Sequence, residues 1–288
     1  MTQSSTISFT IANPELVSKV IELVGNFSDL VNFQLNQNGL TVHAMDNTKV
    51  VLFELQLRVG KAIFYSNQQA PDKEYLFGIN LKILGHATKG LKEDDELKMS
   101  FSTNDDSCLQ VTVRKKFPLR VFQYKIAQFL TVDSETYEIE EFDKQVDVEL
   151  LMKTSYFSQM IKELGAIGGD RIKIEVRQLG ETSESPCSLV MKTSNEFIDA
   201  HIETQENNHL DGITINVKNN ANRPLIVGNE YSCKLLSTIT KASKISDQML
   251  IQMSSDGPLG VLYALEDRVG SFQFFVAPFV DTTSDDED

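Results

Sequence analysis

Apolar and polar side chains alternate along most of this chain, in short runs separated by turn residues. The clearest runs cover residues 33–36, 40–45, 50–57, 97–101, 109–113, 172–176, 189–192, 213–217, 249–253 and 272–276. Alternation at every second residue is typical of strands with one buried face, and the dipeptides Asn38-Gly39 and Asp211-Gly212 favour hairpin turns. The pattern therefore predicts mostly antiparallel sheet.

Four segments repeat their apolar residues at helical spacing instead. They cover residues 14–26, 80–92, 154–165 and 231–245. Apolar residues recur three or four positions apart in each, and Pro14 suits the first turn of a helix. We predict four amphipathic helices, each with one buried face and one face in solvent.

The two halves of the chain repeat the same order of features. Phe77-Gly78 precedes a helix containing Lys89, and Val227-Gly228 precedes a helix containing Lys241; a strand follows each. Another helix comes roughly seventy residues before each of these, which indicates duplication of one domain. The predicted fold class is α+β, with two similar domains of two helices on antiparallel sheet. The predicted parts are residues 1–126, a connector at 127–145, residues 146–280, and a disordered acidic tail at 281–288.

The composition is that of a globular protein, with 41% hydrophobic and 24% charged residues. No apolar run is long enough to span a bilayer, and the polar N-terminus lacks the features of a secretory signal. The three cysteines are far apart, which fits a reducing compartment and disfavours a disulfide framework or a zinc site. The net charge of -14 speaks against nucleic-acid binding unless the cations are segregated.

The predicted helices do segregate them. Their Lys and Arg residues set against their Asp and Glu residues give -1, +3, 0 and +3, so the remaining chain carries -19. A basic helical surface on an acidic protein suits loose, sequence-independent contact with phosphates, which sliding requires. The alternative is that these lysines are ordinary solvated residues of exposed helix faces.

No catalytic constellation is visible, and we expect no cofactor and no enzyme activity. The acidic run Glu93–Glu96 could hold a metal ion, but such runs are more often solvated turns, so no metal site is predicted. The basic cluster Arg114–Arg120 could be a nuclear address, although charge at the end of a strand is the likelier explanation.

Several stretches resemble one family along essentially the whole chain. Gly39–Asp46, Phe77–Leu81, Thr240–Ala242, Met253–Leu259, and Phe274–Phe279 followed by an acidic tail are similar to proliferating cell nuclear antigen. The resemblance implies a DNA sliding clamp, a processivity factor whose three identical subunits close head to tail around duplex DNA. It also implies DNA polymerase and other replication and repair partners, an ATP-driven clamp loader, and a nuclear location or a viral replication site.

The resemblance places cations of the helices against DNA. It matches Lys19, Lys89, Lys162, Lys234 and Lys241 to family positions, while Ser18, Gly25 and His86 stand where the family has lysines. Lys82, Lys92 and Lys244 could compensate. The DNA-binding set is therefore Lys19, Lys82, His86, Lys89, Lys92, Lys162, Lys234, Lys241 and Lys244.

The resemblance also implies two protein-binding surfaces. Partner peptides would bind a pocket of Met45, Val50, Tyr137, Ile139, Pro258, Phe275, Ala277 and Pro278. Subunits would join through Leu109, Val111 and Val113 of one copy and Phe197, Ile198 and Ile202 of the next. For Met45, Val50 and Phe275 the alternative is a place in the core of a strand.

Three other functions stay open on the sequence alone. The chain could be one subunit of a heterotrimeric checkpoint clamp, which would need edges that do not self-associate. It could be a carboxylate-dependent hydrolase on a duplicated scaffold, which metal-dependent turnover would reveal. It could also be an acidic scaffold that does not bind DNA.

Overall fold

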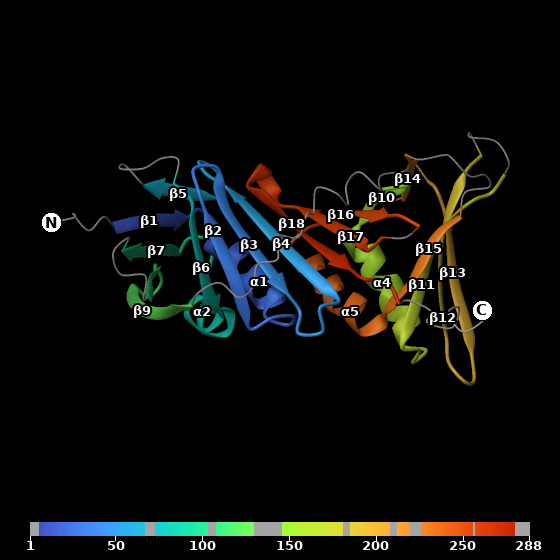
Figure 1. Ribbon diagram of the computed structural model, residues 1–288, viewed down its shortest axis with the longest axis horizontal. Helices are drawn as coiled ribbons and strands as arrows, with labels where there is room; N and C mark the ends of the chain where they lie inside the picture. Colours follow the sequence, from blue (N-terminus) through green and yellow to red (C-terminus); the bar gives the residue numbers. More distant parts are fainter. Residues whose placement is uncertain are drawn as a thin grey trace, which may run out of the picture. The chain divides into compact units, whose positions relative to one another are not determined.

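The computed structural model describes residues 6–66, 73–102, 108–129, 146–180, 185–207, 212–218, 226–255 and 257–279. The chain forms two compact units (Figure 1). Unit 1 comprises Met1–Tyr137 and Ala264–Gln273, and unit 2 comprises Glu138–Tyr263 and Phe274–Asp288.

The described residues of unit 1 form two α-helices and an extensive antiparallel sheet. Its elements are β1 (Thr6–Ile11), α1 (Pro14–Val24), β2 (Leu30–Leu35), β3 (Gly39–Met45), β4 (Val51–Arg58), β5 (Ile63–Ser66), β6 (Tyr75–Asn80), α2 (Leu81–Thr88), β7 (Glu96–Ser102), β8 (Cys108–Lys115) and β9 (Arg120–Phe129). The strands lie in the order β4-β3-β2-β6-β9-β8-β7-β1-β5. β9 pairs with β8 along its length and with β6 only at its last two residues.

Unit 2 repeats this plan. Its elements are β10 (Val148–Lys153), α4 (Thr154–Gly165), β11 (Arg171–Gln178), β12 (Cys187–Ser194), β13 (Asp199–Gln205), β14 (Thr214–Val217), β15 (Ile226–Ser232), α5 (Cys233–Ile239), the 3-10 helix η1 (Thr240–Lys244), β16 (Gln248–Met253) and β17 (Leu259–Ala264). Strands β13-β12-β11-β15 form one sheet, and β14-β10-β16-β17 lie in another. The remaining elements of the described residues are the 3-10 helix η2 (Glu266–Arg268) and β18 (Gly270–Val276), and both units contribute residues to β18.

Side-chain caps determine where three of the helices begin. Asn13 Oδ1 accepts a hydrogen bond from Leu16 N at 2.9 Å, and Asn80 Oδ1 accepts one from Ile83 N at 3.0 Å. Ser232 Oγ accepts from Leu235 N at 3.4 Å. Such caps satisfy backbone N–H groups that have no partner within the helix.

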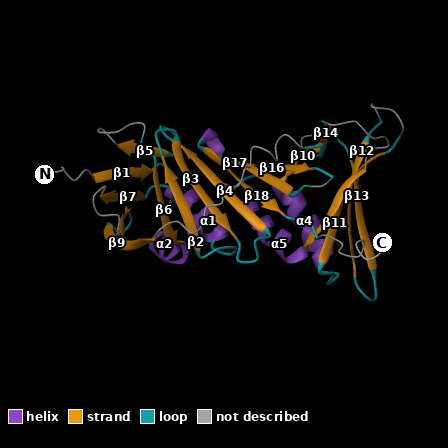
Figure 2. Ribbon diagram, viewed as in Figure 1, coloured by secondary structure: helices purple, strands orange, loops and turns teal. Residues whose placement is uncertain are grey.

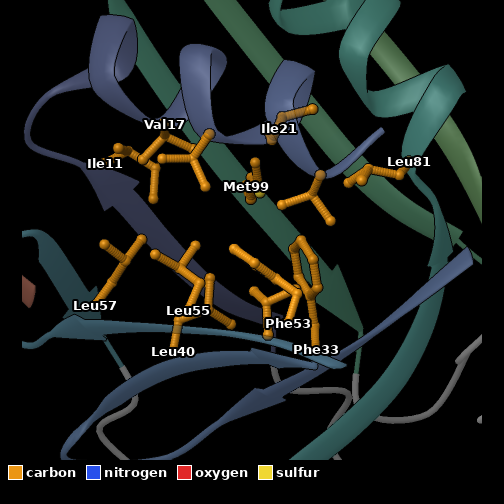
Figure 3. A pocket seen from close by; sticks show the side chains of 13 residues that line it. Ile11, Val17, Ile21, Phe33, Leu40, Phe53, Leu55, Leu57, Leu81 and Met99 are labelled. Carbon is orange, nitrogen blue, oxygen red and sulfur yellow. The ribbon is translucent and has the colours of Figure 1, made fainter. Parts of the chain in front are cut away.

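The core of unit 1 lies between α1 and the sheet. Strands such as β3 alternate buried and half-exposed residues, as the sequence pattern predicts. Figure 3 shows apolar side chains of α1, among them Val17 and Ile21, facing Phe33, Phe53 and Met99 of the strands. The cavity they leave is only about 20 Å³ and wholly apolar, so it is a packing void of the core and not a ligand site.

The predicted fold class is confirmed: in the described part of each unit, two α-helices pack against antiparallel strands (Figure 2). The fourth predicted helix is divided, because α5 ends at Ile239 and η1 continues it with tighter turns. The predicted second domain contains residues 264–273, whereas the structure places them in unit 1. There Arg58 N donates to Val269 O at 2.9 Å and Phe53 contacts Phe272. Most of the predicted connector and the acidic tail lie outside the described residues.

Candidate nucleic-acid interface

The two helices of unit 1 pack beside each other, which gathers their exposed residues on one side of the sheet. Ser18 Oγ on α1 donates to Thr88 O on α2 at 2.8 Å. Val17 and Ile21 are buried below α1, and Leu81 and Leu84 below α2. Lys19, Lys82 and His86 lie on α1 and α2, whereas Lys89 and Lys92 follow α2, which ends at Thr88 and is shorter than the predicted helix at 80–92.

All five predicted DNA-binding residues of unit 1 are exposed: Lys19, Lys82, His86, Lys89 and Lys92. Lys19 lies 2.8 Å from Glu15, and Lys82 lies 2.7 Å from Asp29. Both pairs are solvated, and solvated pairs of this kind stabilise a protein by only about 0–1 kcal/mol. A phosphate group can therefore compete for either lysine.

Unit 2 has the same arrangement. α4 contacts both α5 and η1, and the four predicted cations Lys162, Lys234, Lys241 and Lys244 are exposed on these helices. Residues 233–244 contain three lysines and no acid. Residues 81–92, at the equivalent place in unit 1, also contain three lysines and no acid. The second helical segment of each unit is thus the basic one.

The predicted partner pocket draws on both units, and only its parts can be described. In unit 1, Met45 and Val50 are half-exposed at the end of β3 and just before β4. In unit 2, Ala277 is exposed and Pro258 and Pro278 are half-exposed, but Phe275 is 7% exposed and so resembles a core residue. Tyr137 and Ile139 lie outside the described residues.

Asp46 organises the loop that carries Val50. Its carboxylate accepts hydrogen bonds from Val50 N at 2.7 Å, from Val51 N at 2.6 Å and from Thr48. Partial burial acts to raise the pKa of Asp46, but these hydrogen bonds outweigh it and hold the pKa below its usual value. Sequence reasoning missed this residue, although an Asp at the start of a turn is the relevant signal.

The structure corrects the predicted subunit interface in unit 1. The side chains of Leu109, Val111 and Val113 are at most 1% exposed within the unit itself, and β8 is paired on both sides. They cannot form a surface between subunits. Their strict alternation is the pattern of a strand facing its own core. Among the described residues, β9 pairs with β6 only at Gln128 and Phe129, so residues 120–127 present an unpaired edge, as does the terminal strand β5.

β9 is exposed along nearly its whole length and carries Tyr124 and Phe122, whose rings are stacked. Its charged residues are Arg120 and Lys125, with no acid. The sequence pattern does not predict this strand, because its apolar residues do not alternate strictly with polar ones. The available signal for an exposed edge was the run Val121, Phe122 and Tyr124 between the cations Arg120 and Lys125.

In unit 2 the predicted interface residues Phe197, Ile198 and Ile202 lie at or just before β13. Within the described parts of the chain this strand pairs only with β12 and forms the end of its sheet. Phe197 is 91% exposed and Ile198 is 47% exposed. β13 contains Asp199 and Glu203 and has no Lys or Arg, so its charge is opposite to that of β9.

Two other possibilities carry no support. Among the described residues no group of three or more His, Cys, Asp or Glu side chains could hold a metal ion, and these residues include Glu93–Glu96. No helix in the described part of the chain is long and apolar enough to cross a membrane.

Known proteins similar to this chain are clamps. A family model described as "Repair protein Rad1/Rec1/Rad17" matches residues 7–264. Proliferating cell nuclear antigen of Caenorhabditis elegans is 25% identical over 280 residues, which cover 96% of this chain and 97% of that protein. The same protein of Saccharomyces cerevisiae is 25% identical over 269 residues, covering 91% and 94%.

A solved structure agrees with these matches at the level of the fold. The crystal structure of proliferating cellular nuclear antigen from Entamoeba histolytica covers 95% of this chain and 99% of its own, with 20% sequence identity and a TM-score of 0.74. The family resemblance seen in the sequence is therefore confirmed, while the matching family model carries the name of repair proteins. The chain belongs to the Rad1/Rec1/Rad17 family of clamps similar to proliferating cell nuclear antigen, a family of sliding clamps and not of enzymes.

Proposed function

We propose that this protein is a sliding-clamp subunit that encircles duplex DNA and holds replication and repair enzymes on it. The observation that carries the proposal is the acid-free, lysine-bearing segment in each unit, residues 81–92 and 233–244. All six of their lysines are exposed, on a protein whose net charge is -14. Phosphates are therefore attracted to these segments and repelled by most of the remaining surface.

The strength of the contact suits sliding. Each phosphate that a lysine neutralises releases counterions, so many close contacts would give tight, strongly salt-dependent binding. Lys19 and Lys82 already have acidic neighbours, and the other helix cations are spread over two units. Such a surface holds DNA without fixing its register.

The open edges of β9 and β13 support a homotrimer. A free strand edge can accept the backbone of another strand. β9 contributes Arg120 and Lys125, and β13 contributes Asp199 and Glu203, so the β9 edge of one copy and the β13 edge of the next have opposite charge. Contacts of this head-to-tail kind close into a ring when the rotation between copies permits.

A second candidate is one subunit of a heterotrimeric checkpoint-type clamp. The matching family model, with its name of repair proteins, favours it. The mass in solution discriminates: a homotrimer has three times the mass of one chain, and a subunit of a mixed ring stays smaller when purified alone. Tyr124→Ala should dissociate a homotrimer into monomers, whereas Gln123→Ala on the opposite face of β9 should not.

Partner proteins would bind through a peptide pocket to which Met45, Val50, Pro258, Ala277 and Pro278 contribute. Half-exposed apolar side chains of this kind accept apolar and aromatic anchors of a peptide. An ATP-driven loader would open the ring, and the protein would act in the nucleus. Ala277→Arg should abolish binding of a clamp-binding peptide, while unchanged peptide affinity would move the pocket elsewhere.

The decisive experiment for the proposed function compares DNA with and without free ends. The loaded protein should stay on circular or end-blocked DNA and be lost from linear DNA of equal length. Equal retention on both forms contradicts sliding. Lys89→Ala combined with Lys241→Ala should weaken polymerase stimulation at moderate salt and leave the ring intact.

A further inference from the structure

The turn between β8 and β9 is a basic hairpin tip, of which the proposed function uses only Arg120. We define the hairpin tip as residues 115–120. It contains Lys115, Lys116 and Arg120, and no acid occurs anywhere between residues 108 and 129. At its end the side chains of Phe117 and Leu119 are 87% and 73% exposed. An aromatic ring in water among cations is an uncommon surface on an acidic protein.

Hydrogen bonds attach the hairpin tip to the loop that follows α2. Asp95 accepts from Lys116 N at 3.0 Å and from Lys92 N at 2.9 Å. Lys115 Nζ donates to Gly90 O at 3.4 Å. Partial burial acts to raise the pKa of Asp95, but these backbone N–H groups and the nearby lysines keep it lowered. The hairpin tip is thus held beside the end of the basic helix.

The register of the strands places the tip's cations on the helix side of the sheet. Lys115 follows the buried Val113 by two residues, so both side chains point to the same face. Arg120 is the cross-strand partner of Lys115 and shares that face. Lys115 and Arg120 therefore extend the surface that carries Lys89 and Lys92.

Three acids of the run Glu93–Glu96, which lies beside the tip, have local partners, and one of them, Glu96, lies 3.6 Å from Arg114. Asp94 lies 3.3 Å from Lys116 Nζ, both side chains being well solvated, and Asp95 binds two backbone N–H groups. A solvated pair such as Asp94 and Lys116 exchanges readily for another anion. The cations of the tip thus remain available to a polyanion.

We propose that the hairpin tip contacts single-stranded DNA next to the encircled duplex, with its lysines on phosphates and Phe117 stacked on an unpaired base. The charge alone would suit any phosphate backbone, but a duplex buries the faces of its bases. Exposed aromatic rings set among cations are the means by which proteins bind single strands without sequence preference. This inference rests on the proposed function, because it adds a contact to the same DNA-facing surface.

The test measures equilibrium binding of the full-length protein to a fluorescent single strand of about 20 nucleotides and to the matching duplex, over a salt series. Lys115→Ala combined with Lys116→Ala should lower the slope of log affinity against log salt by about 1.4 for the single strand, at about 0.7 per contact. Phe117→Ala should weaken single-strand binding about fivefold or more and duplex binding less than twofold.

Lys98→Ala is the matched control. Lys98 is exposed on β7 between the buried Leu97 and Met99, so its side chain lies on the sheet face away from the helices. The control should bind both DNA forms as the wild type does. Equal losses in Lys98→Ala and the double variant, or no single-strand binding by the wild type at low salt, would overturn the proposal.

Further results distinguish single-strand binding by the tip from a protein contact at the tip and from failure of the proposed function. If Phe117→Ala changes the mass of the assembly and leaves single-strand affinity unchanged, the tip is a protein contact and the inference fails. If the hairpin variants bind oligonucleotides normally while the wild type slides on circular DNA, the inference fails and the proposed function stands. Loss of retention on circular DNA by the wild type contradicts the function instead.

Discussion

Unit 2 contains two groups of cations that do different physical work. On β11 and β12, Lys173, Arg177 and Lys192 surround the carboxylate of Glu175. On α5 and η1, Lys234 and Lys244 are exposed and have no acid on their own helical segment. The first group neutralises an acid inside the unit, and the second leaves its charge in solvent.

The group around Glu175 is a closed network. Lys173 lies 2.8 Å from Glu175, Arg177 lies 2.5 Å from it, and Lys192 lies 3.1 Å from it, while the glutamate side chain is only 6% exposed. Its neighbours Ile174 and Val176 are fully buried, so Glu175 faces the other side of the sheet. Burial alone would raise the pKa of Glu175, but the hydrogen bonds from the three cations lower it to about 2.

The comparison shows that the number of cations in a region says little about ligands. Three cations around a buried carboxylate hold two neighbouring strands together. Lys234 and Lys244 have no acid on their own helical segment. Their charge is therefore not cancelled locally, and it can attract a polyanion from a distance even though the whole chain is acidic. The placement of the acids decides between these uses.

The largest expected effect is structural. Glu175→Gln should lower the free energy of unfolding by about 2 kcal/mol at pH 7, because three cations lose their common partner. We expect less than the about 3–5 kcal/mol of a fully buried pair, since the cations are partly hydrated. Urea denaturation measures the change, with the exposed Glu163→Gln on α4 as control. An equal, small change in both variants would remove the distinction between the two regions.

The same network predicts a pH dependence. The pKa of Glu175 is about 2 in the folded protein and 4.5 in its ordinary state, so its contribution is complete above pH 4.5. The contribution is lost as the pH falls from 4.5 towards 2, because the carboxylate is protonated. Over this range the stability difference between wild type and Glu175→Gln should shrink towards zero. A constant difference would show that the carboxylate charge is not involved.

The helix lysines should affect DNA binding and not stability. Lys234→Ala combined with Lys244→Ala should lower the slope of log affinity against log salt by about 1.8 for duplex DNA, at about 0.9 per contact. The free energy of unfolding should change by less than about 0.5 kcal/mol. Lys173→Ala should instead lower the free energy of unfolding and leave the salt dependence of DNA binding unchanged. If Lys173→Ala reduces DNA binding as much as the double variant does, the cations around Glu175 also bind DNA and the comparison fails.

The smallest expected effect concerns a single member of the cluster. Lys192→Ala should cost about 0.5 kcal/mol, because Lys173 and Arg177 still neutralise Glu175 and the lysine is partly solvated. Urea denaturation of Lys192→Ala and of Glu175→Gln in parallel measures the ratio of their losses in free energy of unfolding. A cost as large as that of Glu175→Gln would mean that Lys192 alone carries the network.

The repeated helices and the alternating strands were predictable because both depend on local periodicity. α4 has the predicted bounds, and α1 begins at the predicted Pro14. All nine predicted DNA-facing residues, eight lysines and His86, are exposed; those on the helices occupy polar positions of an amphipathic pattern, which face solvent. Their role in binding DNA stays a prediction.

The sequence could not show which strand edges are open. The family resemblance implies an interface on β8, yet β8 is an interior strand, and residues 120–127 of β9 carry the unpaired edge. Strand order depends on pairing between distant segments, which periodicity does not encode. The three cations around Glu175 also come from two strands and two register positions, so they meet only in the folded sheet.

The most direct test of the central claim follows the protein on one DNA molecule before and after that molecule is cut. The protein is loaded onto circular DNA, excess protein is removed, and a single restriction cut is made while bound protein is recorded. The account predicts stable retention on the circle and prompt release after the cut, at a salt concentration where direct binding is weak. Release before the cut, or retention after it on DNA with free ends, would contradict the claim that the protein surrounds DNA without gripping it.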